Sequence, residues 1–178
     1  MIDLETPRLL LRRFALDDVD FVLDMYSRWE VQRYIGRVPR VMASRDEAVE
    51  RVERYAAFAE PDPDGIWLIA DRTTGERFGT ALLKGLPASG PSEPLEPSGE
   101  TEIGWHLHPD AWGRGIASEA ASRVLEYAFG AGLDHVLAVT NPDNTASQAV
   151  ARRIGMRDQG LTDAYYNATC ALFRVDRA

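Results

Sequence analysis

The chain has 178 residues, a formal net charge of −8 and a single cysteine, and 45% of its residues are hydrophobic. This length and composition fit one folded domain, which we expect to span residues 1–178, and exclude a disordered chain. One cysteine excludes an intramolecular disulfide and a cysteine-rich metal site, so no metal is expected. The net negative charge disfavours a nucleic-acid partner, because phosphate contacts need clustered basic groups.

The sequence shows no sign of a membrane segment. No apolar run approaches the roughly 20 residues that cross a bilayer, and Asp3 and Glu5 precede any apolar run at the N-terminus. Neither a membrane partner nor a secretory signal is therefore expected, and a cytoplasmic protein is the simplest interpretation. The acidic surface could attract an amine or a basic peptide, or it could be a solvated face without a partner.

The first predicted elements are one strand and two helices. Residues 8–14 are predicted as a strand, and residues 17–27 as a helix with several apolar positions. Ser44, with Glu47 three residues later, forms the capping box of a second helix that should end near residue 59.

Two strands follow, over residues 66–71 and 77–86, joined by a turn at 73–76 that is typical of a hairpin. Residues 87–99 are rich in proline, glycine and serine and are predicted as a mobile loop. Such a loop could help to form an acceptor pocket, or it could lie on the surface without a role.

The middle of the chain carries the most informative pattern. Residues 102–107 alternate as in a strand, which Pro109 ends because it has no N–H to give to a sheet. Gly113 and Gly115 then open a helix with an apolar face. Glycines let a ligand approach the backbone, and the unpaired N–H groups of a first helical turn suit a phosphate. An ordinary strand–turn–helix would also fit the glycines alone.

These glycines match neither a P-loop nor a dinucleotide fingerprint. The pattern Trp112-x-x-Gly115-x-Ala117 resembles motif A of the GNAT (Gcn5-related) N-acetyltransferases, which cradles the pyrophosphate of acetyl-CoA. Trp112 stands where much of that family has Gln or Arg. The spelling of residues 112–120 is nonetheless similar to that of the ribosomal-protein alanine N-acetyltransferases, the RimJ/RimL-like subgroup.

A second block occurs in the order expected for this family. Residues 134–139 are predicted as a buried strand, and a helix over residues 148–154 follows Asn144 and Ser147. This resembles the family's second signature, a strand, Asn-x-x-Ser and a helix ending in Leu-Gly-Phe. Here the ending is Ile-Gly-Met at residues 154–156.

Residues 5–12 and 17–20 resemble the opening of the same subgroup, and strands over residues 156–161 and 169–175 are predicted to end the chain. The resemblance therefore covers nearly the whole sequence. It implies an α/β (α+β) GNAT fold, a mixed central sheet of about seven strands flanked by about four helices on both faces.

The resemblance also implies a set of acetyl-CoA contacts. Backbone groups of residues 106–108 should pair with the pantetheine arm as an added strand, and backbone N–H groups of residues 113–118 should hold the pyrophosphate. Arg114 could add a charge-assisted bond, and Arg152 or Arg153 could reach the adenosine 3′-phosphate. The cofactor-binding residues expected are His106, Leu107, His108, Gly113, Arg114, Gly115, Ile116, Ala117, Ser118 and Asn144.

Two catalytic residues are implied. Glu102, on the strand before motif A, stands where some relatives place the glutamate that receives the proton of the amine. The alternative is a surface carboxylate at a sheet edge. Ser147 is the candidate for protonating the departing CoA thiolate, although a serine hydroxyl can also bond back to its own helix. His106 shares a strand face with Glu102 and could shuttle protons, or could be a hydrogen-bonded core histidine.

Asn144 should cap the helix that follows it while its side chain contacts pantetheine or a bridging water. Tyr165 and Tyr166 could line the acceptor pocket, act as an acid or simply pack. A monomer and a homodimer both stay open.

Acetyl transfer in this family proceeds by direct attack of a neutral amine on the thioester. Neutralising a lysine amine at neutral pH costs about 4–5 kcal/mol, whereas an α-amine costs only about 1–1.5 kcal/mol. This favours the N-terminal amine of a protein, of the ribosomal-protein alanine type, as the acceptor. A small-molecule amine such as an antibiotic or polyamine, or a catalytically silent acyl-CoA-binding module, are the alternatives.

Overall fold

The computed structural model describes residues 2–58 and 63–178. The described strands form one sheet in the order β1-β2-β3-β4-β5-β6-β8-β7, in which β5 and β6 are parallel and the other neighbours antiparallel. The strands are β1 (Leu4–Glu5), β2 (Leu9–Arg12), β3 (Gly65–Asp71), β4 (Arg77–Pro87), β5 (Pro97–Leu107), β6 (His135–Thr140), β7 (Arg157–Thr162) and β8 (Cys170–Asp176).

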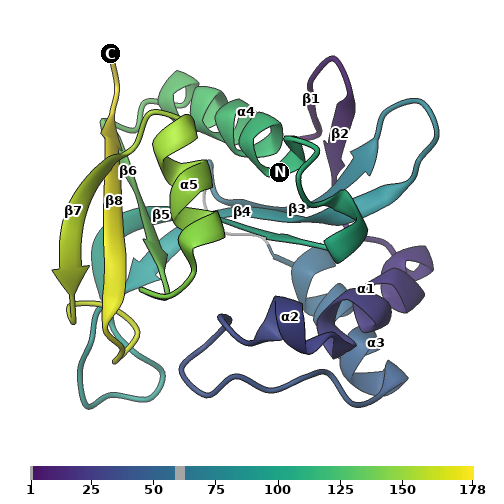
Figure 1. The fold of residues 1–178 in the computed structure, drawn as a ribbon, viewed down its shortest axis with the longest axis horizontal. Helices are drawn as coiled ribbons and strands as arrows, with labels where there is room; N and C mark the ends of the chain where they lie inside the picture. The colour runs from purple at the N-terminus through teal and green to yellow at the C-terminus, as the bar shows by residue number, and fades with distance from the viewer. Residues whose placement is uncertain (1, 59–62) are drawn as a thin grey trace.

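Helices cover both faces of this sheet (Figure 1). Within residues 2–58 and 63–178, three helices lie on one face and two on the other, and two short 3-10 turns precede the first and the fourth helix. The helices are α1 (Val19–Ser27), α2 (Trp29–Gln32), α3 (Arg45–Ala56), α4 (Ile116–Gly130) and α5 (Thr145–Arg153). The predicted mixed sheet with helices on both faces is therefore confirmed. Within the described residues, no helix combines the length and apolar character that a bilayer crossing requires.

The structure adds two short elements to the prediction. Strand β1 consists of two residues that pair with β2, Leu4 opposite Leu11, and α2 is a single turn after Arg28. Elements this short have no periodicity of their own, because their conformation depends on the neighbours they contact. The expected loop at 87–99 is also shorter, since β4 and β5 extend to Pro87 and Pro97.

The start of α3 agrees with the capping box predicted from the sequence. Ser44 accepts a hydrogen bond from the Glu47 N–H at 3.3 Å, as expected for the start of α3. The helix ends at Ala56, and the end predicted near residue 59 falls outside the described residues.

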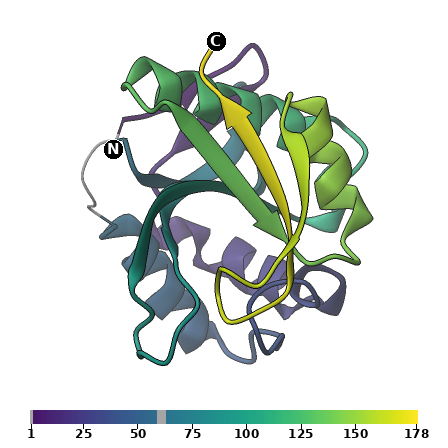
Figure 2. The same cartoon turned by 90° about the vertical axis from the view of Figure 1, so that its left-hand side faces the viewer.

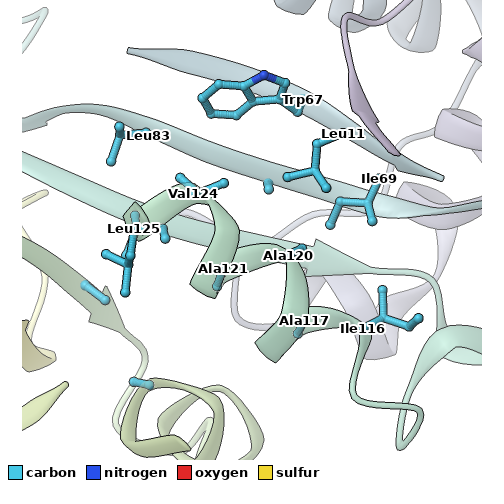
Figure 3. Close-up of a cluster of buried hydrophobic side chains, with 14 of the residues drawn as sticks. Leu11, Trp67, Ile69, Leu83, Ile116, Ala117, Ala120, Ala121, Val124 and Leu125 are labelled. Atoms are coloured by element: carbon cyan, nitrogen blue, oxygen red, sulfur yellow. The ribbon is translucent and has the colours of Figure 1, made fainter. Parts of the chain in front are cut away.

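Two hydrophobic cores lie on opposite faces of the sheet. One is built by α4 and α5 against the strands, and the apolar face of α4 packs onto Leu11, Ile69 and Leu83 (Figure 3). The other is built by α1, α2 and α3 against Ile66 and Leu68. Strand β3 supplies side chains to both cores, which is why its residues from 65 to 70 are buried without alternation.

The sheet opens between β5 and β6. These parallel strands pair only at Glu102 and Leu137, whereas β4 follows β5 along its length and β8 follows β6. In the side view of Figure 2, β6 and β8 run steeply across the picture while β4 and β5 curve away from them. The C-terminal part of β5 therefore has an unpaired edge.

Candidate active site

A cleft of about 1050 Å³ opens where β5 and β6 separate. Its walls come from β4, β5 and β6, the first turns of α4 and α5, the residues after α2, and the turn before β8. All predicted site residues except His108 and Arg114 line it. The predicted residues lining the cleft are Glu102, His106, Leu107, Gly113, Gly115, Ile116, Ala117, Ser118, Asn144 and Ser147.

The open edge of β5 offers backbone groups to a ligand. In an antiparallel pair, alternate residues direct both their N–H and C=O to the partner strand. The His108 N–H donates to the Phe78 carbonyl at 2.9 Å, and the register places His106 opposite Thr80, so His106 and His108 face β4. Trp105 and Leu107 therefore face the gap, whereas the backbone of His106 and His108 is directed towards β4.

The sequence analysis named the backbone of residues 106–108, and of these three residues only Leu107 faces the gap. Parity depends on the register between β4 and β5, which the sequence alone does not show. The His108 imidazole lies outside the cleft, with Nε2 3.1 Å from the Asp24 carboxylate.

Trp112 occupies one of the backbone groups on the unpaired edge of β5. Its indole Nε1 donates to the Leu107 carbonyl at 3.0 Å, and its ring lines the cleft while remaining half-exposed. The N–H of Leu107 and both backbone groups of Trp105 remain for a ligand. Trp112 therefore provides a hydrogen-bond donor, its indole N–H, at a position where much of the family has Gln or Arg.

The glycine turn before α4 has the geometry of an anion site. Gly113 and Gly115 have φ values of +72° and +76°, in the left-handed region that favours glycine, and Gly115 is the N-cap of α4. The first-turn N–H groups at residues 116–118 have no carbonyl partner within the helix and line the cleft. These residues fit the pyrophosphate of a CoA thioester.

Among the candidate arginines, Arg153 lies at this turn, and its Nη1 donates to the Ser118 hydroxyl at 3.0 Å. Arg152 instead bonds to Asp158 at 2.8 Å. Arg114 also points elsewhere, because its guanidinium lies 4.8 Å from the centre of the Phe78 ring and 3.6 Å from Glu76. The side chain of Arg114 therefore does not support the predicted phosphate contact, whereas Arg153 is placed for one.

Hydrogen bonds from the N-terminal segment, here called the Thr6–Glu119 tie, stabilise the same turn. Glu119, in the first turn of α4, accepts hydrogen bonds from the Thr6 hydroxyl at 2.5 Å and from Arg8 Nε at 2.7 Å. Arg8 also donates to the Arg114 carbonyl at 3.2 Å. Burial opposes the charge of Glu119, but the Thr6 and Arg8 hydrogen bonds outweigh it and lower its pKa. The sequence analysis matched residues 5–12 and residues 112–120 to the family. It did not show that these two segments contact each other.

Glu102 lies at the inner wall of the cleft, buried, within a three-residue network. Lys84, its register partner on β4, places Nζ 2.9 Å from Glu102 Oε1, and the same Nζ donates to the Tyr166 hydroxyl at 2.7 Å. The Tyr166 hydroxyl in turn donates to Glu102 Oε1. Burial, reinforced by the Glu102 charge, raises the pKa of Tyr166, so its hydroxyl stays protonated and remains a donor.

Tyr166 is held in place by an unusual turn. Tyr166 and Asn167 have φ values of +58° and +51°, a conformation that costs energy for residues with a side chain. The Asn167 amide exchanges two hydrogen bonds with the backbone of Gly90, at 2.8 and 2.9 Å. The loop at 88–96 therefore does not line the cleft itself but braces the turn that carries Tyr166.

His106 is a neutral residue in this cleft. Its Nδ1 lies 3.0 Å from the Tyr26 hydroxyl, which also contacts Thr80 at 3.2 Å. Burial, together with the positive charges of Arg51 and Lys84, lowers the pKa of His106 to about 4. The imidazole is therefore uncharged at neutral pH.

Ser147 lies across the cleft, in the first turn of α5. Asn144 caps this helix, as expected, because its Oδ1 accepts from the Ser147 N–H at 3.1 Å. The Ser147 hydroxyl lines the cleft and has no hydrogen-bond partner among the described residues, so it does not bond back to its own helix. Such a hydroxyl is available to a ligand.

Comparisons with known proteins agree with this geometry. The profile of the acetyltransferase (GNAT) domain family matches residues 8–157. The chain is 32% identical over 163 residues to the uncharacterized N-acetyltransferase YoaA of Bacillus subtilis, covering 91% of this chain and 86% of YoaA.

Two solved structures share the fold. RimL, a ribosomal L7/L12 alpha-N-protein acetyltransferase in complex with coenzyme A, superposes with a TM-score of 0.75 at 18% identity over 98% of both chains. MccE, a microcin C7 self-immunity acetyltransferase in complex with acetyl-CoA and AMP, gives 0.74 at 15% identity over 97% of this chain and 94% of MccE. The chain belongs to the GNAT acetyltransferase family and is an N-acetyltransferase that uses acetyl-CoA as its acetyl donor.

Proposed function

We propose that the acceptor is the N-terminal amine of a protein, which attacks the thioester directly in a ternary complex. The amine nitrogen forms a bond to the acetyl carbon while the carbon–sulfur bond breaks. Glu102 receives the proton that the amine loses, directly or through water, and the Ser147 hydroxyl donates to the departing thiolate. A CoA thiol, with a pKa of roughly 8.5, is a tolerable leaving group, so Ser147 assists rather than determines the reaction.

The observation that carries this proposal is the balanced charge around Glu102. Its carboxylate is compensated by Lys84 at 2.9 Å and accepts a hydrogen bond from Tyr166. The neighbouring His106 is neutral. Because Lys84 and Tyr166 already contact this carboxylate, an acceptor that is partly neutral at pH 7 suits the site. An α-amine costs about 3 kcal/mol less to neutralise than a lysine side chain.

The acceptor side of the cleft is also reachable by a chain end. Residues 33–37, after α2, line it, and Arg33, Gly36 and Arg37 among them are exposed. A segment of peptide can therefore lie along this rim with its amine pointing towards Glu102. The likeness to RimL supports this choice of acceptor, whereas the likeness to MccE supports a small-molecule amine, which is the second candidate.

An acceptor panel tests the proposal. Thiol release from acetyl-CoA should be measured with peptides that begin in Ala or Ser, with the same peptides blocked at the N-terminus, and with a polyamine and an aminoglycoside. We expect release only with the free peptides. Release only with the small amines would overturn the peptide proposal.

Two variants test the residue roles in the same assay. Glu102→Gln and Ser147→Ala should lower kcat while calorimetry shows unchanged acetyl-CoA binding, with the loss larger for Glu102→Gln. An unchanged kcat in Glu102→Gln would contradict its role as proton acceptor.

A further inference from the structure

The arginines of this chain divide into two groups. Most form ion pairs with Asp or Glu, as expected in a protein with 28 acidic and 20 basic residues. The arginines without a carboxylate partner anywhere in residues 2–58 and 63–178 are Arg13, Arg33, Arg37, Arg51, Arg54 and Arg153. In a chain with excess carboxylates, an unpaired guanidinium requires an explanation.

Three of these arginines, Arg33, Arg37 and Arg153, line the cleft. Arg153 lies at the turn that fits pyrophosphate, and Arg33 and Arg37 line the opposite, acceptor side. Arg51 lies 4.2 Å from the centre of the Tyr26 ring, whose hydroxyl contacts His106. Three unpaired arginines therefore line the cleft, two of them on the proposed acceptor side.

Aromatic rings lie beside several of these arginines. The guanidinium of Arg33 lies 4.6 Å from the centre of the Tyr34 ring, and that of Arg54 lies 5.8 Å from the Tyr55 ring. Stacking on an aromatic face orients a guanidinium but leaves its N–H donors unused. Donors arranged in this way suit a carboxylate or a phosphate, which they can bind through charge-assisted hydrogen bonds.

The local charge balance on the acceptor side is positive. The carboxylates that line the cleft there are Glu30 and Glu102, and Lys84 already compensates Glu102. Glu30 can offset only one of Arg33 and Arg37, and Arg51 adds a further charge.

We infer that the acceptor carries an anionic group close to its amine, and that Arg33 and Arg37 bind this group. Resting on the proposed function, the acceptor is a protein whose N-terminal residue is followed by acidic side chains. The net charge of −8 repels such a chain from most of the surface, while the positive rim attracts it, which favours the cleft over other encounters. The acidic surface thus does not signify a basic acceptor.

Three peptides of equal length test this inference. Each begins in Ala and differs only at positions two to four, which are acidic, neutral or basic, and free aspartate serves as a small anionic amine. We expect the acidic peptide to exceed the neutral one in kcat/KM by about tenfold, the size that one or two charge-assisted hydrogen bonds supply. The preference should shrink as salt is raised, because the rim arginines are exposed.

Arg33→Gln/Arg37→Gln should abolish the preference for the acidic peptide and leave the KM for acetyl-CoA unchanged. The matched control is Arg45→Gln/Arg157→Gln, which removes the same charge from exposed arginines that pair with Asp20 and Asp176. This control should keep the preference. A raised KM for acetyl-CoA in the Arg33/Arg37 variant, with the preference intact, would overturn the inference, because these arginines would then serve the cofactor.

The outcomes separate this inference from the proposed function. Equal rates on the three peptides would overturn the anionic acceptor and leave the peptide proposal standing. Acetylation of aspartate alone, lost in the Arg33/Arg37 variant, would overturn the peptide proposal and support the anionic group. Acetylation of polyamines alone would overturn both.

Discussion

Tyr166 donates a hydrogen bond to the carboxylate of Glu102, a residue 64 positions earlier in the chain. This contact joins the turn before β8 to the strand that precedes the glycine turn, across the acceptor end of the cleft. It fixes one oxygen of Glu102, which also contacts Lys84. The strained backbone of Tyr166 therefore places its hydroxyl where it orients the Glu102 carboxylate, which we propose as the proton acceptor.

Tyr166→Phe should lower kcat without changing the affinity for acetyl-CoA. The ring is kept, but Glu102 loses the donor that orients it. We expect a loss of about 10-fold, a fraction of the roughly 10²–10⁴-fold that a positioned acid or base contributes. The matched control is Tyr165→Phe, whose hydroxyl has no hydrogen-bond partner within the described part of the chain and which should keep full activity. Equal losses in both variants would contradict a specific role for the Tyr166 hydroxyl.

Gly115→Ala should weaken acetyl-CoA binding. A Cβ at φ +76° costs about 1 kcal/mol, so the turn relaxes and its N–H groups lose their common direction. The control is Gly132→Ala, after the other end of the same helix, with φ +102° and open space around the added Cβ. Both variants should lose similar stability in urea titrations, whereas calorimetry should show weaker acetyl-CoA binding only for Gly115→Ala.

The neutral His106 makes stability depend on pH in a defined range. Its pKa is about 4 in the folded chain, against about 6.5 for an ordinary histidine, so the unfolded chain takes up a proton first as the pH falls. Stability is therefore lost between roughly pH 6.5 and pH 4, and at pH 5 the loss amounts to about 2 kcal/mol. Urea titrations from pH 7.5 to 5 should show a smaller loss in His106→Gln. Parallel curves for the two proteins would contradict this prediction.

Glu119→Gln should reduce both stability and cofactor affinity. The substitution removes the charge that Arg8 binds and leaves Arg8 less constrained beside the Arg114 carbonyl. We expect a loss of about 1 kcal/mol in the free energy of unfolding, as for a partly exposed ion pair with added hydrogen bonds. Glu126→Gln, on the exposed side of the same helix, is the control and should change neither quantity. Unchanged acetyl-CoA affinity in Glu119→Gln would show that the tie only stabilises the fold.

Most of the fold was predictable, because it depends on local patterns. Alternation predicted the C-terminal part of β5, apolar spacing predicted α4, and Ser44 was identified as the cap of α3. Asn144 was identified as the cap of α5, although this helix begins at Thr145 and not at the predicted residue 148. Strand β1 and helix α2 were not predictable, since contacts with neighbouring elements decide them.

The sequence located the parts of the site that depend on local backbone conformation. It did not locate the parts that depend on contacts between residues far apart in the sequence. The glycine turn and the residues around it could be located from the motif, because positive φ values select glycine. Long-range contacts had no local signal, so neither the Thr6–Glu119 tie nor the Lys84–Glu102 pair was foreseen. The same limitation explains why the sequence suggested a phosphate contact for Arg114, whose guanidinium the structure places beside Phe78 and Glu76.

The gap between β5 and β6 has a consequence for the protein when no cofactor is bound. An unpaired strand edge inside a sheet is a template for another chain, and most proteins protect such edges. A ligand that binds the folded chain and not the unfolded one stabilises the fold by mass action. We therefore expect saturating acetyl-CoA to raise the resistance of this chain to unfolding, and its removal to leave the edge at Trp105 and Leu107 exposed.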